Sequence, residues 1–248
     1  MSSISFDADD ETVASGTAVK ELKDEGYYKV TIALTEEAAE CYTLTDADFI
    51  VQVKKKDNFA DVLPSKWYAQ SVYAAKVNKY VNGLAGSDVF MPEANISRAD
   101  AVCILFNMAG GETEFEGRKD ETGGYETGFS DVDAHEYYAL AIQWAKQAGV
   151  VNGYGDGSFA PDKLVSREEF ACMLANFSKA MHDFEAADSS VLDAFDDANE
   201  VDSWAKESVA WAVANKIMGN SGEINADDSI LRAEVAAMAV NYMPGMFA

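Results

Sequence analysis

Three segments of the chain repeat one pattern, and this repetition constrains the fold more than any other feature. The segments begin at Phe59, Phe129 and Phe195, and each opens with Phe-x-Asp. An aromatic residue follows six or seven positions after each Asp, and a helical pattern of apolar residues comes next. Because self-similarity of this kind is typical of repeat architectures, we interpret the segments as three copies of one structural unit.

Each copy continues with a loop and a second helix, which opens on "SRAD", "SREE" or "LRAE". Ser97 and Ser166 are placed as N-caps, with Asp100 and Glu169 three residues later in the capping-box arrangement. Leu231 breaks this rule in the third copy, where Ser229 or Asp228 is expected to cap the helix instead. The unit is therefore predicted to be helix, loop, helix.

One such unit is too small to bury its apolar face, so the three copies are expected to pack around a shared core. They cover residues 59–110, 129–182 and 195–242, and polar stretches rich in turn-forming residues connect them. Residues 1–58 differ, because "YYKVTIAL" alternates and "FIVQV" is rich in β-branched residues. The prediction is a mainly α fold of three repeats, preceded by a small β-containing segment or the remnant of a preceding domain.

Composition excludes several classes of function. A formal net charge of -24 argues against nucleic-acid binding, which rests on clustered Lys and Arg. No apolar run reaches the length of about 20 residues that spans a membrane, and "MSSISFDADDET" lacks the basic start and apolar core of a signal peptide. Cys41, Cys103 and Cys172 are too far apart for a disulfide framework or a CxxC metal site, so we interpret them as small residues on packed helix faces.

The sequence offers little support for a metal site or for catalytic residues. If Asp156 and Gly157 are aligned with the middle of an EF-hand loop, Tyr154 and Lys163 stand where oxygen ligands are needed. The Asp-Gly pair is better explained as turn chemistry. The two histidines lack metal-ligand spacing, and no nucleophile motif surrounds a Ser or Cys. We therefore expect no metal, no cofactor and no enzyme activity.

An arginine recurs in the first turn of each second helix, where a cation opposes the helix dipole. The three residues are Arg98, Arg167 and Arg232. Two explanations remain open. Each arginine could form an ion pair with the opening Asp of its own copy, or its guanidinium could face a groove that accepts a carboxylate or phosphate.

The Phe-x-Asp-Val opening with its aromatic, the "GVVNGYGDGSFAPDKLVSREEFA" of the second copy and the "LRAEVAAM" of the third resemble the S-layer homology family. The resemblance covers residues 59 to about 242. It implies a pseudo-threefold, three-pronged module in which the first helices form a central helix bundle. Grooves between the prongs would bind secondary cell-wall polysaccharide, in many members through pyruvylated N-acetylmannosamine. The protein would then be anchored non-covalently at the bacterial cell surface, outside the cell.

Carried over by position, the resemblance implies ligand-binding roles for nine residues. They are Arg98, Arg167, Arg232, Asp61, Asp131, Asp197, Trp67, Tyr137 and Trp204. Tyr137 replaces the usual Trp, "LRAE" lacks the usual Thr, and the third copy lacks the Asp-Gly turn, so the three grooves are not expected to be equivalent. The alternative function is that of a structural surface-layer protein, whose repeats self-associate through lattice contacts.

Overall fold

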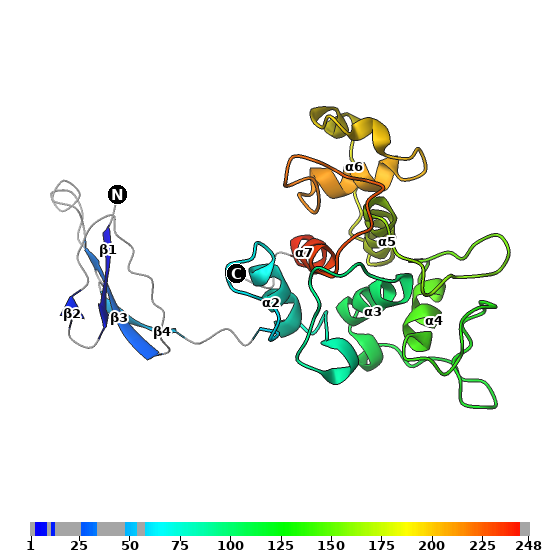
Figure 1. The fold of residues 1–248 in the computed structure, drawn as a ribbon, viewed down its shortest axis with the longest axis horizontal. Helices are drawn as coiled ribbons and strands as arrows, with labels where there is room; N and C mark the ends of the chain where they lie inside the picture. The colour runs from blue at the N-terminus through cyan, green and yellow to red at the C-terminus, as the bar shows by residue number, and fades with distance from the viewer. Residues whose placement is uncertain (1–2, 9–10, 13–25, 34–47, 54–57, 244–248) are drawn as a thin grey trace. The chain divides into compact units, whose positions relative to one another are not determined.

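The structure is a computed structural model, and it describes residues 3–8, 11–12, 26–33, 48–53 and 58–243. The chain divides into two compact units, residues 1–57 and 58–248 (Figure 1). The first unit contains the strands β1 (Ser3–Ala8), β2 (Glu11–Thr12), β3 (Gly26–Ala33) and β4 (Asp48–Val53). They form one antiparallel sheet in the order β2-β1-β3-β4. The predicted β content is confirmed, with β3 and β4 at the two segments singled out from the sequence.

The second unit contains two main helices per repeat, as predicted. The six helices are α2 (Ala69–Val77), α3 (Arg98–Met108), α4 (Ala139–Gln147), α5 (Arg167–Ala180), α6 (Lys206–Ala214) and α7 (Arg232–Tyr242). Four short 3-10 helices lie between them in the described part of this unit: η1 (Leu84–Gly86), η2 (Gly111–Thr113), η3 (Ser189–Ala194) and η4 (Ala198–Glu200). Of these, η3 packs against α6 and buries Leu192, although the sequence suggested a solvated connection there.

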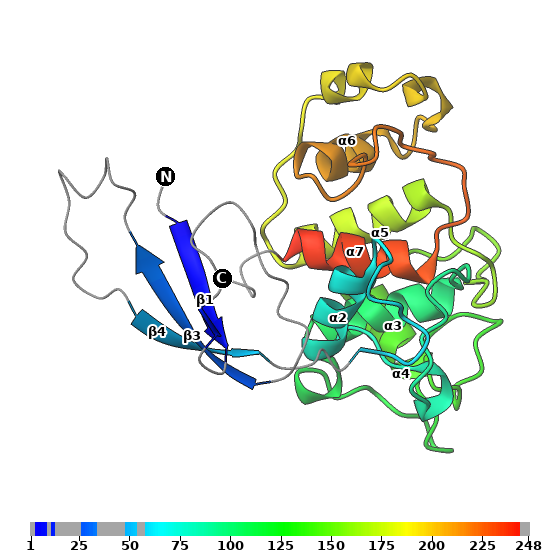
Figure 2. The same ribbon diagram turned by 60° about the vertical axis from the view of Figure 1, so that its left-hand side comes forward.

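The second helices of the repeats, α3, α5 and α7, occupy the centre of this unit (Figures 1 and 2). Each first helix packs on the outside against the second helix of the preceding repeat: α4 on α3, α6 on α5, and α2 on α7. The central bundle is therefore confirmed, but the implied placement of the first helices within it is wrong. The physical reason is that the residues just before α3, α5 and α7 hydrogen-bond from repeat to repeat, which brings the starts of these three helices together.

Three backbone hydrogen bonds close the repeats into a ring just before these central helices. The amide of Val165 donates to the carbonyl of Ile96 at 3.1 Å, that of Ile230 to Val165 at 2.9 Å, and that of Ile96 to Ile230 at 3.2 Å. All three side chains are fully buried. The last repeat thus bonds to the first as each bonds to its neighbour, which is the pseudo-threefold arrangement expected.

The helix caps follow the prediction only in part. Ser97 and Ser166 accept hydrogen bonds from the amides of Asp100 and Glu169, each at 3.2 Å. Glu169 in turn accepts a hydrogen bond from the amide of Ser166, which completes a capping box. Asp100 accepts instead from Tyr137 and Arg232 of the other repeats. The expected polar cap of α7 is wrong, since Leu231 is the N-cap residue and makes no side-chain cap bond.

Two further expectations concern the thiols and the membrane. Cys103 and Cys172 are free and partly buried, and burial raises the pKa of both, that of Cys103 to about 12, so they are poor nucleophiles. Cys41 lies outside the described residues. Within the described ranges, every helix is too short or too polar to cross a bilayer.

Candidate ligand-binding grooves

The three arginines that open the central helices are buried, each with 8% of its surface exposed. Each Nε donates to a loop carbonyl of the next repeat around the ring: Arg98 to Phe159 at 3.1 Å, Arg167 to Ile224 at 2.7 Å, and Arg232 to Phe90 at 2.8 Å. The arginines therefore connect repeats to one another, whatever else they bind.

Two of the arginines form ion pairs with carboxylates of other repeats. Arg167 pairs with Glu234, and Nη1 of Arg232 lies 3.4 Å from Oδ2 of Asp100. The proposed pairing with the opening Asp of the same repeat is absent among the described residues. The physical reason is that these Asp side chains are already engaged by backbone amides.

Each opening Asp holds the loop of its own repeat. Asp61 accepts from the amides of Phe90 and Met91 at 2.9 and 2.7 Å, and Asp131 accepts from Phe159 and Ala160 at 2.7 Å each. Asp197 accepts from Ile224 and Asn225 through one oxygen, which leaves its Oδ1 buried without a partner. In each loop, the second of the two residues whose amides bond to the Asp has a positive φ. These residues are Met91, Ala160 and Asn225, and residues other than glycine rarely adopt this conformation. The carboxylates stabilise these turns.

The three aromatics that follow the opening Asp are exposed. Trp67, Tyr137 and Trp204 have 64%, 71% and 56% of their surface accessible. The hydroxyl of Tyr137 donates to Asp100 at 2.8 Å, and burial of that end of the side chain together with this bond raises its pKa, so the hydroxyl stays a donor. Exposed aromatic faces held by the fold are suited to stacking against the apolar face of a ring.

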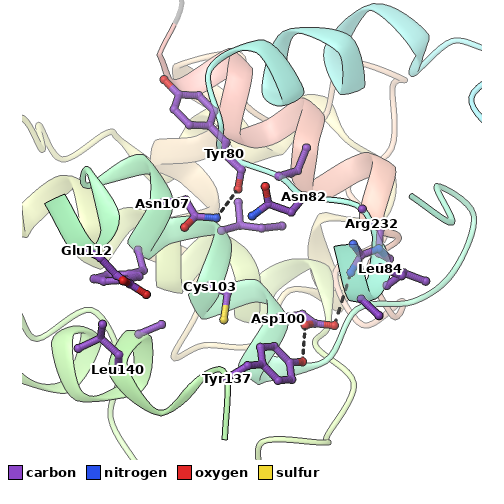
Figure 3. Close-up of a pocket in the computed structure, with 16 residues that line it drawn as sticks. Tyr80, Asn82, Leu84, Asp100, Cys103, Asn107, Glu112, Tyr137, Leu140 and Arg232 are labelled. Carbon is purple, nitrogen blue, oxygen red and sulfur yellow. Dashed lines mark hydrogen bonds and ion pairs between the residues drawn. The ribbon is translucent and has the colours of Figure 1, made fainter. Parts of the chain in front are cut away.

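One pocket of about 740 Å³ takes side chains from all three repeats (Figure 3). The first repeat contributes its loop from Tyr80 to Ala85 and the face of α3, the second contributes Tyr137, and the third contributes Arg232. Asp100 lies between Tyr137 and Arg232 and bonds to both. The wall of this pocket thus combines an aromatic ring, a carboxylate acceptor and a guanidinium donor.

A second pocket, of about 550 Å³, has the same construction one step around the ring. Trp67 from the first repeat, Arg167 from the second and Glu234 from the third occupy the positions that Tyr137, Arg232 and Asp100 have in the first pocket. Neither pocket is complete without all three repeats. The structure thus brings one predicted arginine and one predicted aromatic together in each pocket.

The third junction between repeats, where Arg98 lies, has different contacts from the junctions at Arg232 and Arg167 that form the two pockets. Glu169 holds the position of Asp100 and Glu234, but it pairs with Lys163 at 2.6 Å. Within the described residues Arg98 has no carboxylate partner, and its guanidinium lies over the rings of Phe159 and Tyr154. The expectation that the three sites are not equivalent agrees with these contacts.

Sequence reasoning missed three asparagines that fix the loops beside the pockets. Asn107, Asn176 and Asn241 each donate to a carbonyl of their own repeat, at Tyr80, Val150 and Ile217 respectively. Each stands nine residues after the recurring Arg, so the repeat alignment contained the signal. Asp100 and Glu234 were also missed as site residues, since Asp100 was interpreted as a capping residue alone and no role was predicted for Glu234.

One group of carboxylates could in principle hold a cation. Glu168, Asp202 and Asp227 offer oxygens within 4.8 Å of one another. Oε2 of Glu168 accepts from the amide of Asp202 at 3.0 Å, and the other two residues are exposed. Acidic side chains cluster in this way without an ion, so we assign no metal to them. At the Asp-Gly turn, Oδ1 of Asp156 accepts from the amide and hydroxyl of Ser158, which confirms the turn interpretation.

Substitution of Glu168 tests how much the burial of its charged carboxylate destabilises the folded state. Only 2% of it is exposed, and burial raises its pKa. A raised pKa in the folded state means that its ionisation disfavours folding as the pH rises through that value. Glu168→Gln is therefore expected to raise the melting temperature at neutral pH, with the gain vanishing below the ordinary pKa of a Glu. The exposed Glu136→Gln serves as control, and equal effects of the two variants would contradict the assignment.

Residues 128–171 and 194–236 match the family model of the S-layer homology domain. The chain is 30% identical over 106 residues to a cellulosome-anchoring protein of Acetivibrio thermocellus, an alignment covering 43% of this chain and 22% of that protein. It is 31% identical over 175 residues to the surface-layer 125 kDa protein of Lysinibacillus sphaericus, covering 71% and 14%.

A third relative is the exoglucanase XynX of Acetivibrio thermocellus, 24% identical over 188 residues, or 75% of this chain and 16% of the relative. The chain thus spans 22% or less of the length of each of these curated relatives. The family model matches residues in the second and third repeats, and in the first repeat Ile96 makes the same ring-closing hydrogen bonds as Val165 and Ile230, while α2 packs on α7 as α4 packs on α3.

Proposed function

We propose that this chain, which carries S-layer homology domains at residues 128–171 and 194–236, is a non-covalent anchor that holds a protein at the bacterial cell wall. Its ligand would be secondary cell-wall polysaccharide, bound in the grooves between repeats. The pyruvylated N-acetylmannosamine implied by the resemblance is one candidate residue of that polymer. A cellulosome-anchoring protein and a surface-layer protein among the relatives support a role at the cell surface.

The observation that carries the proposal is the repeated construction of two open pockets from three repeats. In each, an exposed aromatic stands beside a buried Arg and its carboxylate partner. An aromatic face suits the apolar face of a sugar ring, and fixed donors and acceptors suit its hydroxyl groups. We assign no catalytic step to these side chains, and any enzyme activity, as named for the exoglucanase relative, would belong to another part of a longer protein.

Retention on purified cell walls tests the proposal. The protein is mixed with walls that bear the polysaccharide and with walls from which it has been removed, and the bound fraction is measured after sedimentation. We expect retention on the first and its loss on the second, because the pockets would lose their ligand. Equal retention on both would contradict the proposal.

The alternative of lattice contacts between copies predicts a different result. A protein that only self-associates would form larger assemblies as its concentration rises in the absence of sugar, as measured by analytical ultracentrifugation. Its bound fraction would be the same on walls with and without the polysaccharide. Concentration-dependent assembly together with equal wall retention would therefore favour the surface-layer role over polysaccharide binding.

A further inference from the structure

Two asparagines of the chain are followed by glycine, and they stand at the same position in the first and second repeats. The pairs are Asn82–Gly83 and Asn152–Gly153. Both asparagines are exposed, and within residues 58–243 neither side chain takes part in a hydrogen bond. The backbone amides of the two glycines also donate to no acceptor there. The two groups that react with each other in asparagine deamidation, the side-chain amide carbon and the next backbone nitrogen, are therefore both free.

The fold requires glycine at both of these positions. A Cβ at Gly83 would lie 1.8 Å from the carbonyl oxygen of Ser87, and one at Gly153 would lie 2.6 Å from that of Ser158. Both distances are far shorter than a van der Waals contact. Glycine has no side chain to hinder attack by its nitrogen, and its backbone rotates freely, so asparagine reacts more readily before glycine than before a larger residue. The packing of the loop thus keeps a reactive dipeptide in each of the two repeats.

Other exposed asparagines lack part of this arrangement. In the third repeat the two residues stand in reverse order, as Gly219 and Asn220. The side chain of Asn220 also donates to a backbone carbonyl of its own repeat at 2.8 Å. Asn95 has a free side chain, but the amide that follows it, that of Ile96, donates to Ile230 in the ring of repeats. Asn95 and Asn220 are therefore natural controls within the same chain.

We propose that Asn82 and Asn152 are sites of spontaneous deamidation. The nitrogen of the following glycine loses its proton to solvent and attacks Cγ of the asparagine, a reaction between groups that the chain already holds together. The bond from Cγ to the side-chain nitrogen breaks, and ammonia leaves with a proton from solvent. Water then opens the cyclic imide. Opening at the α-carbonyl gives isoaspartate, and opening at Cγ gives aspartate. Water is consumed and ammonia released, and no oxidant or cofactor takes part.

At Asn82 this reaction changes the wall of the larger pocket. Asn82 lines that pocket together with Asp100 and Glu112, and Asn107 fixes the start of its loop by donating to the carbonyl of Tyr80 (Figure 3). Isoaspartate would add a methylene group to the backbone of this loop and a carboxylate to the wall. Retention on polymer-bearing walls is therefore expected to fall as the protein ages. This consequence rests on the proposed function, whereas the reaction itself does not.

Incubating the full chain in a mildly alkaline buffer tests the inference, because hydroxide removes the proton from the attacking nitrogen. The protein is then digested at mildly acidic pH, where the reaction is slow, and the peptides are analysed by chromatography and mass spectrometry. Exchange of the amide nitrogen for oxygen raises the peptide mass, and isoaspartate separates from aspartate. We expect Asn82 and Asn152 to convert at least about tenfold faster than Asn95 and Asn220. Similar rates at all four, or conversion at none, would overturn the inference.

Two matched variants connect the reaction to the pocket. Glutamine would have to close a larger ring, so Asn82→Gln and Asn152→Gln each block one site. The affinity of each protein for polymer-bearing walls is measured before and after incubation. We expect a loss of about tenfold for the wild type and for Asn152→Gln, and no loss on incubation for Asn82→Gln. Equal losses in both variants, or complete conversion of Asn82 with unchanged retention, would contradict the consequence for the pocket.

Failure of this inference can be distinguished from failure of the proposed function. If Asn82 and Asn152 convert but even the fresh protein is not retained on polymer-bearing walls, the anchoring role fails and the modification sites stand. If the fresh protein is retained and neither asparagine converts faster than the two control asparagines, the modification sites fail and the anchoring role stands.

Discussion

Replacing Arg167 with alanine is expected to lower the free energy of unfolding by about 3 to 5 kcal/mol. The variant leaves Glu234 partly buried without its cation and the carbonyl of Ile224 without its donor. A domain is stable by only about 5 to 15 kcal/mol, so much of that margin would be lost. Urea denaturation followed by far-ultraviolet circular dichroism measures the effect.

Two other arginine variants serve as controls for Arg167→Ala. Arg118 has 78% of its side chain exposed and pairs with Glu126 at the surface, so Arg118→Ala is expected to cost less than about 1 kcal/mol. Arg98→Ala removes a buried donor but strands no carboxylate, and an intermediate cost of about 1 to 3 kcal/mol is expected. Equal stability of all three variants would show that the arginines do not hold the repeats together.

Truncating the exposed aromatic is the cleaner test of binding. Trp67→Ala is expected to weaken retention on polysaccharide-bearing walls about tenfold, which corresponds to about 1.4 kcal/mol of lost stacking. Because 64% of Trp67 is exposed, the change should leave the unfolding free energy close to that of the wild type. Binding isotherms on walls, measured beside the denaturation curve, separate the two effects.

The matched control lies in the same repeat, further along the chain. Val77, at the end of α2, is 56% exposed and is not among the residues that line either pocket. Val77→Ala should retain wild-type affinity for the walls. Wild-type binding by Trp67→Ala would remove this pocket from the proposed site, and an equal loss in both variants would point to a general surface effect.

These predictions change how the recurring arginines can be used as probes. An alanine substitution that lowers binding would not by itself identify a ligand contact at Arg167 or Arg232, because each also bonds to a loop carbonyl and to a carboxylate of another repeat. The nine residues implied by the resemblance thus fall into three groups. The arginines connect repeats, the aspartates hold loops, and the aromatics are exposed, with Tyr137 and Trp67 each lining one pocket.

Local patterns in the sequence were enough to predict the secondary structure and the repeat. The apolar spacing of α4, the Ser caps of α3 and α5 and the alternation in β3 depend on residues within a few positions of one another, and the structure has each of them. The Asp156 turn belongs to the same class. Such features are determined by the sequence itself, since backbone geometry and hydrogen bonding within a turn do not depend on distant parts of the chain.

The partners of the arginines were decided only by the tertiary structure. Arg232 bonds to the carbonyl of Phe90, 142 positions away, and to Asp100, 132 positions away. Spacing along the chain suggested Asp197 of the same repeat, but that carboxylate accepts instead from the amides of its own loop, at Ile224 and Asn225. Closing three repeats into a ring moves each helix start against a neighbouring loop. Contacts made in that way follow from the packing of the whole unit, which no local pattern encodes.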